Sequence, residues 1–407
     1  DIIWDEANLD AWITNPKKFI GKRTSMVVKI KKAEDRAAIK VHDVGLILRK
    51  NEAGENGVKI LVGGGLGRTP IIASTIREWL PFGELLGYLE ALMRVYNRHG
   101  RRDNKYKARI KILVQALGIV EMTRQVEEEY AKIEQADPTL IENELTRIRS
   151  FFDVPPLEEG ADEGSLQSDL VDNRNFAVWY KNNITDHKVA GHSIVSISLK
   201  PVGGIPGDAT SEQMHSLADL ADQYGQSDIR VTHEQNLVLP HVRKADLLAL
   251  YLGLSKAGLG AANIGLASDI IACPGLDYCS LATARSIPVA QNIAKRLEKR
   301  EDDIGKLKIK ISGCINACGH HHVGHIGILG LEKAGKEYYQ ITLGGSGDEQ
   351  AAIGKILGPG FSFDEIDGAI DTLLVTYQGI RKDAETFLET FRRVGEKPFK
   401  EALYAIA

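Results

Sequence analysis

The 407-residue chain lacks any apolar run approaching the ~20 residues that a membrane-spanning helix needs. It also lacks an excess of one charge, since its net charge is −4, and nothing global indicates binding to nucleic acid or to a membrane. No flavin or nicotinamide fingerprint and no export signal is recognisable. Cysteine is scarce, with four residues. These absences favour a cytoplasmic chain of two or three domains whose cysteines stay reduced.

The four cysteines form one pattern, Cys273-x5-Cys279 followed by Cys314-x3-Cys318. Four thiolates with none left over are the ligand set of one [4Fe–4S] cluster, and the apolar, Gly-rich surroundings suit its burial. Zinc sites usually pair cysteines at about two to four intervening residues, so the first pair is widely spaced for zinc. Zinc, disulfides and four ordinary buried cysteines remain the alternatives, although disulfides fit poorly without a secretory signal.

An internal repeat predicts two related halves. The matched segments share an offset of 279 to 281 residues, and they are Ile60–Gly65 with Ile341–Ser346, Tyr96 with Tyr377, and Val44-Gly45 with Val323-Gly324. Each glycine segment is followed by a helical stretch that leads to the tyrosine. We therefore expect residues 27–150 and 257–407 to be two copies of one α+β lobe related by pseudo-twofold symmetry.

Two further regions lie between these lobes. Residues 151–175 are acidic, rich in Pro and Gly, and non-periodic, which predicts a linker. Residues 176–256 predict a β-α-β-β-α unit, with a strand at His192–Leu199, a helix capped by Thr210 and Gln213, two short strands and a further helix. This unit is half of a ferredoxin-like sandwich, and its exposed sheet edge needs a partner.

The cysteine pattern, the segment Arg230–Asn236 and the repeated Gly-Gly lobe together resemble sirohaem-dependent sulfite and nitrite reductases. The resemblance covers about residues 33–407 and is greatest to the assimilatory bacterial sulfite reductase haemoprotein type. It implies an α+β fold with two pseudo-symmetric sirohaem/Fe–S lobes and one ferredoxin-like half-domain. It also implies a six-electron reduction of sulfite to sulfide, or of nitrite to ammonia.

The resemblance assigns roles to the cysteines. Cys273, Cys279, Cys314 and Cys318 would hold the [4Fe–4S] cluster, and Cys318 would also ligate the sirohaem iron and so take part in catalysis. Electrons would pass through this shared sulfur to the substrate. Because no flavin or nicotinamide site is present, they would come from a separate ferredoxin or flavoprotein.

Sirohaem carries many carboxylates, so its pocket needs cations and backbone N–H donors. The candidates are Arg68, Gly64 and Gly65, together with the basic run Arg98–Lys111. The alternatives are a tight turn between strand and helix for the glycines and a solvated helix face for the basic run. Nucleic-acid binding by that run is not expected, because Tyr106 is the single aromatic residue interleaved with its cations.

Other polar residues are candidates for supporting roles. Gln235 and Asn236 lie on a strand–turn that the family uses near its active centre, or they cap that turn. His320–His322 and His325 follow Cys318 closely, and one of them would donate to a cluster sulfur or a sirohaem carboxylate.

Two departures from the family pattern bear on function. Full-length relatives carry another ferredoxin-like half before the first lobe, and we expect this chain, which begins with Asp1, to lack it. Relatives also carry Arg-Lys-x-Lys, whose lysines bind the anionic substrate. Its positions fall at Arg23–Met26, so both lysines are absent unless Lys29 and Lys31 replace them. We therefore expect impaired cofactor binding and weak or absent catalysis, or a degenerate non-catalytic relative.

Residues 1–26 fit the family poorly and stay unplaced. Trp4–Trp12, Asn15–Phe19 and Met26 are similar to the tail of a small c-type cytochrome, but no Cys-x-x-Cys-His is present to attach a haem. The alternative is an amphipathic surface helix. A chimeric or truncated gene product would explain both departures.

Overall fold

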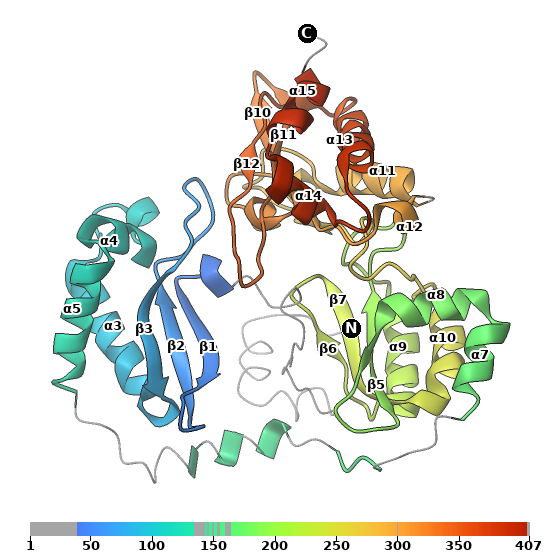
Figure 1. Cartoon of the computed structure of the whole chain (residues 1–407), viewed down its shortest axis with the longest axis horizontal. Helices are drawn as coiled ribbons and strands as arrows, with labels where there is room; N and C mark the ends of the chain where they lie inside the picture. The colour runs from blue at the N-terminus through green and yellow to red at the C-terminus, as the bar shows by residue number, and fades with distance from the viewer. Residues whose placement is uncertain are drawn as a thin grey trace. The chain divides into compact units, whose positions relative to one another are not determined.

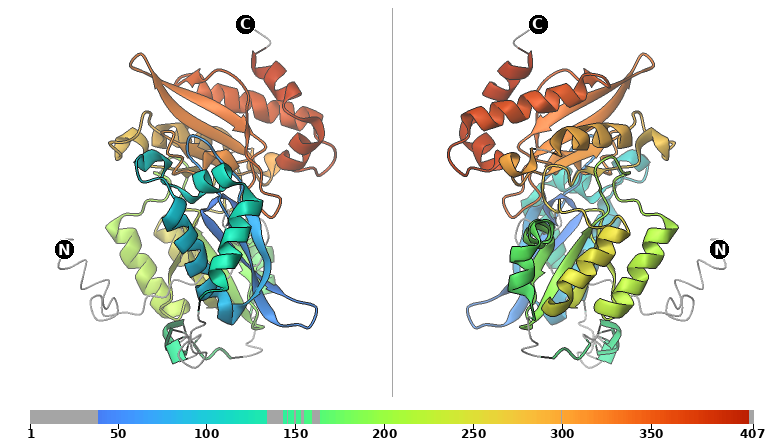
Figure 2. Two further views of the ribbon diagram at one scale, coloured as in Figure 1. Left: turned by 90° about the vertical axis from the view of Figure 1, so that its left-hand side faces the viewer. Right: turned by 90° about the vertical axis from the view of Figure 1, so that its right-hand side faces the viewer.

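The computed structural model describes residues 39–133, 143–144, 146–148, 150–152, 155–158, 164–298 and 300–404 (Figures 1 and 2). The fold is mixed α and β, as the sequence predicts. The described residues fall into two compact units, one within 149–271 and the other formed by those before 149 together with 272–404. The division therefore lies at Ile271, fifteen residues beyond the expected end of the half-domain at residue 256. Among the described residues, no helix is long and apolar enough to span a bilayer.

The first lobe is a three-stranded antiparallel sheet with helices on one face (Figure 1). The strands are β1 (Val44–Lys50), β2 (Asn56–Val62) and β3 (Ser74–Pro81), and the helices are α3 (Leu85–His99), α4 (Ile110–Leu117) and α5 (Ile119–Tyr130). Alternate residues of β2, Val58, Ile60 and Val62, point into the core against these helices. In α3 the buried Tyr88, Ala91, Leu92 and Val95 recur at helical spacing, which fixes the packed face.

The second lobe has a larger sheet in the order β12-β11-β10-β9-β8, with β13 also paired to β11. Its strands are β8 (Ile271–Ala272), β9 (Ile309–Ser312), β10 (Ile326–Lys333), β11 (Lys336–Leu343), β12 (Lys355–Ile356) and β13 (Phe361–Ser362). Its helices are α11 (Ile287–Leu297), α12 (Glu301–Ile304), α13 (Ile366–Ile380), α14 (Phe387–Val394) and α15 (Lys397–Tyr404). The aromatic rings of Tyr377, Phe387 and Phe399 pack together between the last three helices.

The structure confirms the internal repeat but corrects one matched pair. Val44 pairs with Val62 in the first lobe and Ile326 pairs with Leu343 in the second, so Val44-Gly45 corresponds to Ile326-Gly327 and not to Val323-Gly324. Helices α3 and α13 have the same length, and both of their ends differ by the predicted 281 residues. The same offset relates further paired features, which are the β-bridges Gly65–Ile71 and Ser346–Ala352 and the positive φ angles of Gly63 (83°) and Gly344 (78°). The two lobes therefore share their loop geometry as well as their element order.

The second lobe differs from the first by the extra strands β8 and β9, since β12 and β13 together lie where β3 falls at the repeat offset. Strand β9 runs parallel to β10, and β8 lies beyond β9. Cys273 directly follows β8, Cys314 follows β9 by two residues, and the Cys273 amide donates to the Ile311 carbonyl at 3.1 Å. The extra strands thus bring one cysteine of each pair to the same end of the sheet.

The other unit has a four-stranded sheet in the order β4-β5-β7-β6, with helices on one side (Figure 1). Its elements are α7 (Leu166–Asp172), α8 (Arg174–Asn183), β4 (Ile184–Asp186), β5 (His192–Ser198), α9 (Ser211–Tyr224), β6 (Arg230–Val231), β7 (Asn236–Arg243) and α10 (Leu247–Lys256). The predicted capping box of Thr210 and Gln213 is confirmed, and the helix ends before Gly225. Strand β7 is longer than the short strand expected here, because it runs to Arg243.

The expected linker is partly helical. Residues 166–172 form α7, and Leu166 is 2% exposed in the core that contains Phe176 and Trp179. Leu166 and Leu170 lie four residues apart and share one helix face, so an acidic segment is still anchored in the core of this unit. The unplaced segment 1–26, the lysine positions discussed above and parts of the linker lie outside the described residues.

Candidate functional site: the cysteine loops and the glycine loop

The four cysteines lie on loops beside β8 and β9. Cys314 is buried, Cys273 and Cys279 are half-buried, and Cys318 is exposed. The Gly313 amide donates to the Cys273 sulfur at 3.0 Å, and the Ser286 hydroxyl lies 3.5 Å from the same sulfur. The Ser286 hydroxyl donates to the Cys273 carbonyl, so the Gly313 amide is the defined donor to this sulfur, and such a donor stabilises a thiolate and tunes the potential of an iron–sulfur cluster. The loop is therefore arranged to favour a charged sulfur at Cys273.

The Cys318 thiol lies within electrostatic range of the other three. Although its side chain is exposed, partial burial of the sulfur raises the pKa of Cys318, and the cysteines at 273, 314 and 279 raise that pKa further in this order. Mutual repulsion of this kind disappears when thiolates share a positive group. Within the described parts of the chain, no three His, Cys, Asp or Glu side chains are grouped closely enough to hold a single metal ion. The four sulfur atoms are thus neighbours that do not converge on a single point.

Glycines around the cysteines satisfy a packing requirement. A Cβ atom on Gly319 would lie 1.9 Å from the Ile311 carbonyl oxygen, and one on Gly313 would lie 2.8 Å from the Gly275 Cα. Real Cβ atoms do not approach other atoms so closely, so these positions admit only glycine. The predicted Gly-rich surroundings therefore serve the close approach of the two cysteine loops.

His321 is an orphaned polar group beside these loops. Its side chain is 1% exposed, and neither ring nitrogen has a hydrogen-bond partner among the described residues. Burial, followed by the neighbouring His322 and His320, lowers the pKa of His321 to about 3. A buried imidazole with two unsatisfied nitrogens is costly, and a bound group offering a donor or an acceptor would remove that cost. That one of these histidines assists a cofactor remains a prediction.

His325 has a defined partner and a different role. Its Nδ1 accepts a hydrogen bond from the Lys308 amide at 3.2 Å, which requires the neutral ring. Burial lowers the pKa of His325 to about 4, with smaller lowering by Lys308, Lys310 and Arg392 and an opposing effect of Asp348. The ring therefore stays uncharged in the folded chain at neutral pH.

This shift predicts a loss of stability in mild acid. Above the unfolded pKa of about 6.5 neither state protonates His325, whereas between about 6.5 and 4 only the unfolded chain binds the proton. Stability should fall in this window by up to about 1.4 kcal/mol per pH unit. Urea unfolding near pH 7 and pH 5 should show a smaller loss for His325→Asn, which keeps an acceptor for the Lys308 amide but does not titrate. Equal losses in both proteins would contradict the assignment.

The glycine loop of the first lobe connects β2 to β3. This corrects the alternative of a turn between strand and helix, since α3 begins only after β3. Gly64 and Gly65 are buried, and a Cβ on Gly64 would lie 2.5 Å from the Lys40 carbonyl oxygen. Both glycines therefore allow the loop to pack closely against the chain, and their predicted contact with a cofactor remains a prediction.

Lys111 supports this loop by hydrogen bonds to its backbone carbonyls. Its side chain is buried, and its ammonium donates to the Leu66 carbonyl at 2.7 Å and the Thr69 carbonyl at 2.8 Å. Burial lowers the pKa of Lys111, followed by the repulsion of Arg109, while Asp43 opposes both. The basic run thus contains one residue that is built into the loop.

The rest of the basic run lies mostly on the surface. Arg98 pairs with Glu129, Arg101 pairs with Asp103, and Arg109 forms two hydrogen bonds to Asp43. Three of the seven Lys and Arg residues in the run are thus ion-paired. The run is largely solvated, as the sequence alternative proposed, but residues 101–109 form a loop and a short turn instead of a helix face. Arg68 is exposed and has no ion pair among the described residues, so it remains a candidate for binding an anion.

Gln235 and Asn236 belong to the other unit. Asn236 is 4% exposed, accepts from the Leu199 amide at 3.2 Å and donates to Asp269 at 3.1 Å. These bonds tie the start of β7 to the end of β5, which is a structural role. Gln235 adopts a positive φ of 59° and packs closely against Gly207, so it shapes the turn. Their predicted role in binding a cofactor remains a prediction.

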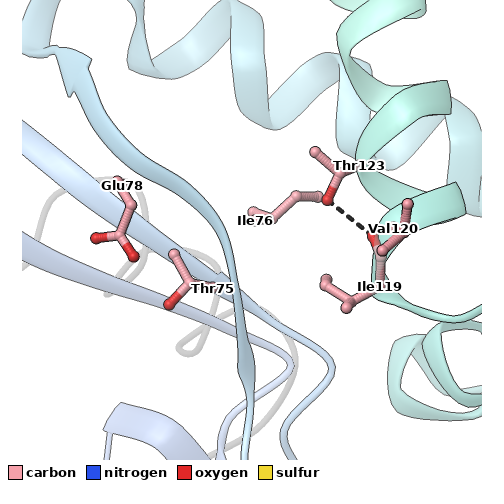
Figure 3. Close-up of a pocket in the computed structure, with 6 residues that line it drawn as sticks. All are labelled: Thr75, Ile76, Glu78, Ile119, Val120 and Thr123. Carbon is pink, nitrogen blue, oxygen red and sulfur yellow. Dashed lines mark hydrogen bonds between the residues drawn. The ribbon is translucent and has the colours of Figure 1, made fainter.

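A separate hollow of about 380 Å³ lies between β3 and α5 (Figure 3). It is lined by Thr75, Ile76, Glu78, Ile119, Val120 and Thr123. The Thr123 hydroxyl donates a hydrogen bond to the Ile119 carbonyl, and Glu78 forms an ion pair with Lys59. Besides these paired groups the lining offers one threonine hydroxyl and apolar side chains, which is not a set of reactive groups.

The site residues fit an iron–sulfur cluster with an anionic cofactor. Four adjacent thiols and an amide donor to sulfur suit the cluster, and two unsatisfied imidazole nitrogens suit a polar group beside it. The Gly67 carbonyl bonds to His322 Nε2 at 3.0 Å, so the glycine loop directly contacts the segment that follows Cys318. Cationic and sulfur ligands therefore occur in one region of this unit.

Comparison with known families gives two matches. The family described as the nitrite and sulphite reductase 4Fe-4S domain matches residues 28–134 and 267–405. The nitrite/sulfite reductase ferredoxin-like half domain matches residues 192–257. The interrupted first match corresponds to the two repeated lobes, and the second to the four-stranded unit.

Individual relatives are similar over most of the chain. Ferredoxin sulfite reductase 1 of Mycolicibacterium paratuberculosis is 26% identical over 88% of the chain, and the ferredoxin–nitrite reductase of Synechococcus elongatus is 28% identical over 79%. The solved structure of the Mycobacterium tuberculosis NirA protein superposes with a TM-score of 0.68 at 25% identity, covering 90% of this chain and 62% of that one. The chain spans about 60% of the length of the curated relatives it matches.

Proposed function

The chain belongs to the nitrite and sulphite reductase family, and we propose that it reduces sulfite to sulfide with a [4Fe–4S] cluster and a sirohaem. The observation that carries the proposal is the set of four neighbouring cysteine sulfurs beside an amide donor and an orphaned histidine. In this reaction sulfite gains six electrons and six protons and releases three water molecules. The cluster and the sirohaem would supply the electron path and the iron that binds the anion.

The cysteines of the chain have distinct tasks in this proposal. Cys273, Cys279 and Cys314 hold the cluster, and the Gly313 amide stabilises the charge on Cys273. Cys318 is the most exposed of the four, which suits a thiolate shared between the cluster and a second iron. A shared sulfur couples the two centres electronically.

The glycine loop supplies the positive side of the pocket. Arg68 is exposed and positioned next to amides that an anion can approach closely, and Lys111 adds a buried cation behind them. Carboxylates of the tetrapyrrole are the matching groups, because a guanidinium binds them in a bidentate manner. Gly64 and Gly65 allow the loop to lie close enough for this contact.

Nitrite is the second candidate substrate. Relatives named for nitrite are 25–29% identical, against 26–27% for those named for sulfite, and they match 79–85% of this chain against 88%. The wider coverage supports sulfite as the first choice. The names of both groups include ferredoxin, and we propose a ferredoxin as the electron donor here too.

An absorption spectrum of protein purified anaerobically from cells that make sirohaem tests the proposal. We expect a Soret band, a red-region charge-transfer band and bound iron, followed by sulfite reduction with a reduced viologen dye as donor. Protein from cells unable to make sirohaem is the matched control. Broad iron–sulfur absorption alone, or a colourless protein without iron, would overturn the reductase assignment for this chain, and faster turnover of nitrite would replace sulfite as the substrate.

A further inference from the structure

Lys40 and His322 occupy equivalent positions in the two lobes. The Lys40 carbonyl accepts from the Ala73 amide at 2.6 Å, and the His322 carbonyl accepts from the Gly354 amide at 2.7 Å. Ala73 and Gly354 differ by the repeat offset of 281 residues. The two carbonyls therefore play the same part in the two copies of the fold.

The glycine loops confirm this equivalence. A Cβ atom on Gly64 would lie 2.5 Å from the Lys40 carbonyl oxygen, and one on Gly345 would lie 2.5 Å from the His322 carbonyl oxygen. Each residue thus passes directly beneath the glycine loop of its own lobe. What differs between the lobes is the side chain, an ammonium in one and an imidazole in the other.

Each of these side chains reaches across to the opposite lobe. The Lys40 ammonium donates to the Glu349 carbonyl of the second glycine loop at 2.5 Å. His322 Nε2 donates to the Gly67 carbonyl of the first glycine loop at 3.0 Å. The two hydrogen bonds form a reciprocal pair that joins the lobes, and we call this pair the clasp.

A small apolar cluster contains the residues that adjoin the clasp in the chain. Val41 and Val323, which directly follow Lys40 and His322, are both buried in it. The partly buried residues packed against this pair are Leu66, Ile72 and Ile353, of which the two isoleucines are related by the repeat. Apolar packing on the pseudo-twofold axis therefore keeps the two crossing hydrogen bonds in register.

The two glycine loops differ in which of their backbone groups are left without hydrogen-bond partners. Within the described chain, the amides of Gly67, Arg68 and Thr69 have no hydrogen-bond partner, while the carbonyls of residues 66, 67 and 69 are bound by Lys111 and His322. Tying back the carbonyls leaves the amide edge available to an anion.

In the second glycine loop, backbone amides donate to side chains of the same loop, and the loop carries negative charge. The Asp348 amide donates to the Ser346 hydroxyl at 3.3 Å, and the Gln350 amide donates to the Asp348 carboxylate at 2.8 Å. Asp348 and Glu349 stand where the first loop has Gly67 and Arg68 at the repeat offset. Both lobes therefore contain the glycine loop, but only the loop of the first lobe is suited to bind an anion.

We propose that Lys40 and His322 are positioning residues, and that the clasp and Lys111 together hold the first glycine loop with its amides ready for a tetrapyrrole carboxylate. The assignment of the carboxylate rests on the proposed function, whereas the clasp rests on contacts within the chain. His322 is the stronger arm, because its bond is partly buried and the bond from Lys40 is exposed to solvent.

Hydrogen exchange on the full chain, purified from cells without sirohaem, tests the clasp. The probes are the mutually paired amides of the two β-bridges, Gly65 with Ile71 in the first loop and Ser346 with Ala352 in the second. His322→Leu should accelerate exchange at the first bridge about fivefold or more and leave the second unchanged, since one hydrogen bond is lost. Lys40→Met should act on the second bridge alone.

Conservative and surface variants complete the comparison. His322→Gln keeps a donor at the same reach and should restore slow exchange at the first bridge, which a purely steric role would not predict. Lys111→Met should loosen the first bridge from its own side, and Lys107→Met, an exposed lysine of the same basic run, should change neither. The clasp would be overturned if His322→Leu or Lys40→Met accelerated exchange at both bridges, or at neither.

Sirohaem titration then tests the role of the loop. His322→Leu should weaken sirohaem binding about tenfold and Lys40→Met by less, with recovery in His322→Gln. Unchanged affinity in His322→Leu would overturn the positioning role while the exchange pattern still decides the clasp. Wild-type protein that binds no sirohaem would refute the proposed function and the carboxylate assignment, and the exchange result would stand separately.

Discussion

Replacing Cys318 by alanine should lower sulfite reduction at least about 1000-fold, equivalent to about 4 kcal/mol of transition-state stabilisation. The reason is that the proposal gives this one sulfur two tasks, as a cluster ligand and as the link to the sirohaem iron. Cys318 is the exposed member of the set, and the other three thiols lie within electrostatic range of it. The measurement is viologen-driven sulfite reduction together with the absorption spectrum and the iron content.

Cys279→Ala is the matched control, because Cys279 is half-buried and has only the first task. Both variants should disturb the iron–sulfur absorption. Only Cys318→Ala should also change the Soret and charge-transfer bands of the sirohaem. If Cys318→Ala keeps activity within about tenfold of the wild type, or if both variants alter the sirohaem bands equally, Cys318 is not the shared ligand.

Local sequence signals predicted much of this fold. The capping box at Thr210 and Gln213 depends on two side chains three residues apart, and it forms as expected. The repeat was visible because identical loop geometry needs glycine at Gly63 and Gly344 in both copies, where φ is positive. Features determined by a few neighbouring residues leave a readable pattern.

Features set by tertiary contacts left no such pattern. Lys111 belongs to a basic run that looks solvated, and only the fold places its ammonium under the carbonyls of Leu66 and Thr69. Leu166 and Leu170 are too few to reveal α7 inside an acidic segment, yet they pack against Phe176. The crossing bonds of Lys40 and His322 join residues 309 and 255 positions apart, which a linear pattern does not show.

The network around Asn236 gives the second large expected effect, a loss of about 3–5 kcal/mol of folding free energy in Asp269→Asn. Asp269 and Lys200 form an ion pair at 2.5 Å, and their side chains are 5% and 2% exposed. The Lys200 ammonium also donates to the Glu234 carbonyl, so removing the carboxylate leaves a buried cation with neutral acceptors alone. Breaking one side of such a pair leaves an uncompensated charge.

Substituting the other partner, Lys200, separates the effect of charge from that of packing. In Lys200→Met, Asp269 still accepts from the Asn236 side chain at 3.1 Å and the Gly265 amide at 2.8 Å, so its charge keeps two donors. The double variant Lys200→Met/Asp269→Asn removes both charges and should be more stable than Asp269→Asn alone, with a coupling of about 1–3 kcal/mol.

Hydrogen exchange of peptides from β5 and β7 measures this effect in the half-domain alone, combined with urea unfolding of the full chain. Lys181→Met, an exposed lysine on α8, is the control and should stay within about 0.5 kcal/mol of the wild type. A loss below about 1 kcal/mol in Asp269→Asn would mean that water or another acceptor already compensates Lys200. A double variant no more stable than the single one would show that Asp269 acts through its two other hydrogen bonds, and not by neutralising the lysine.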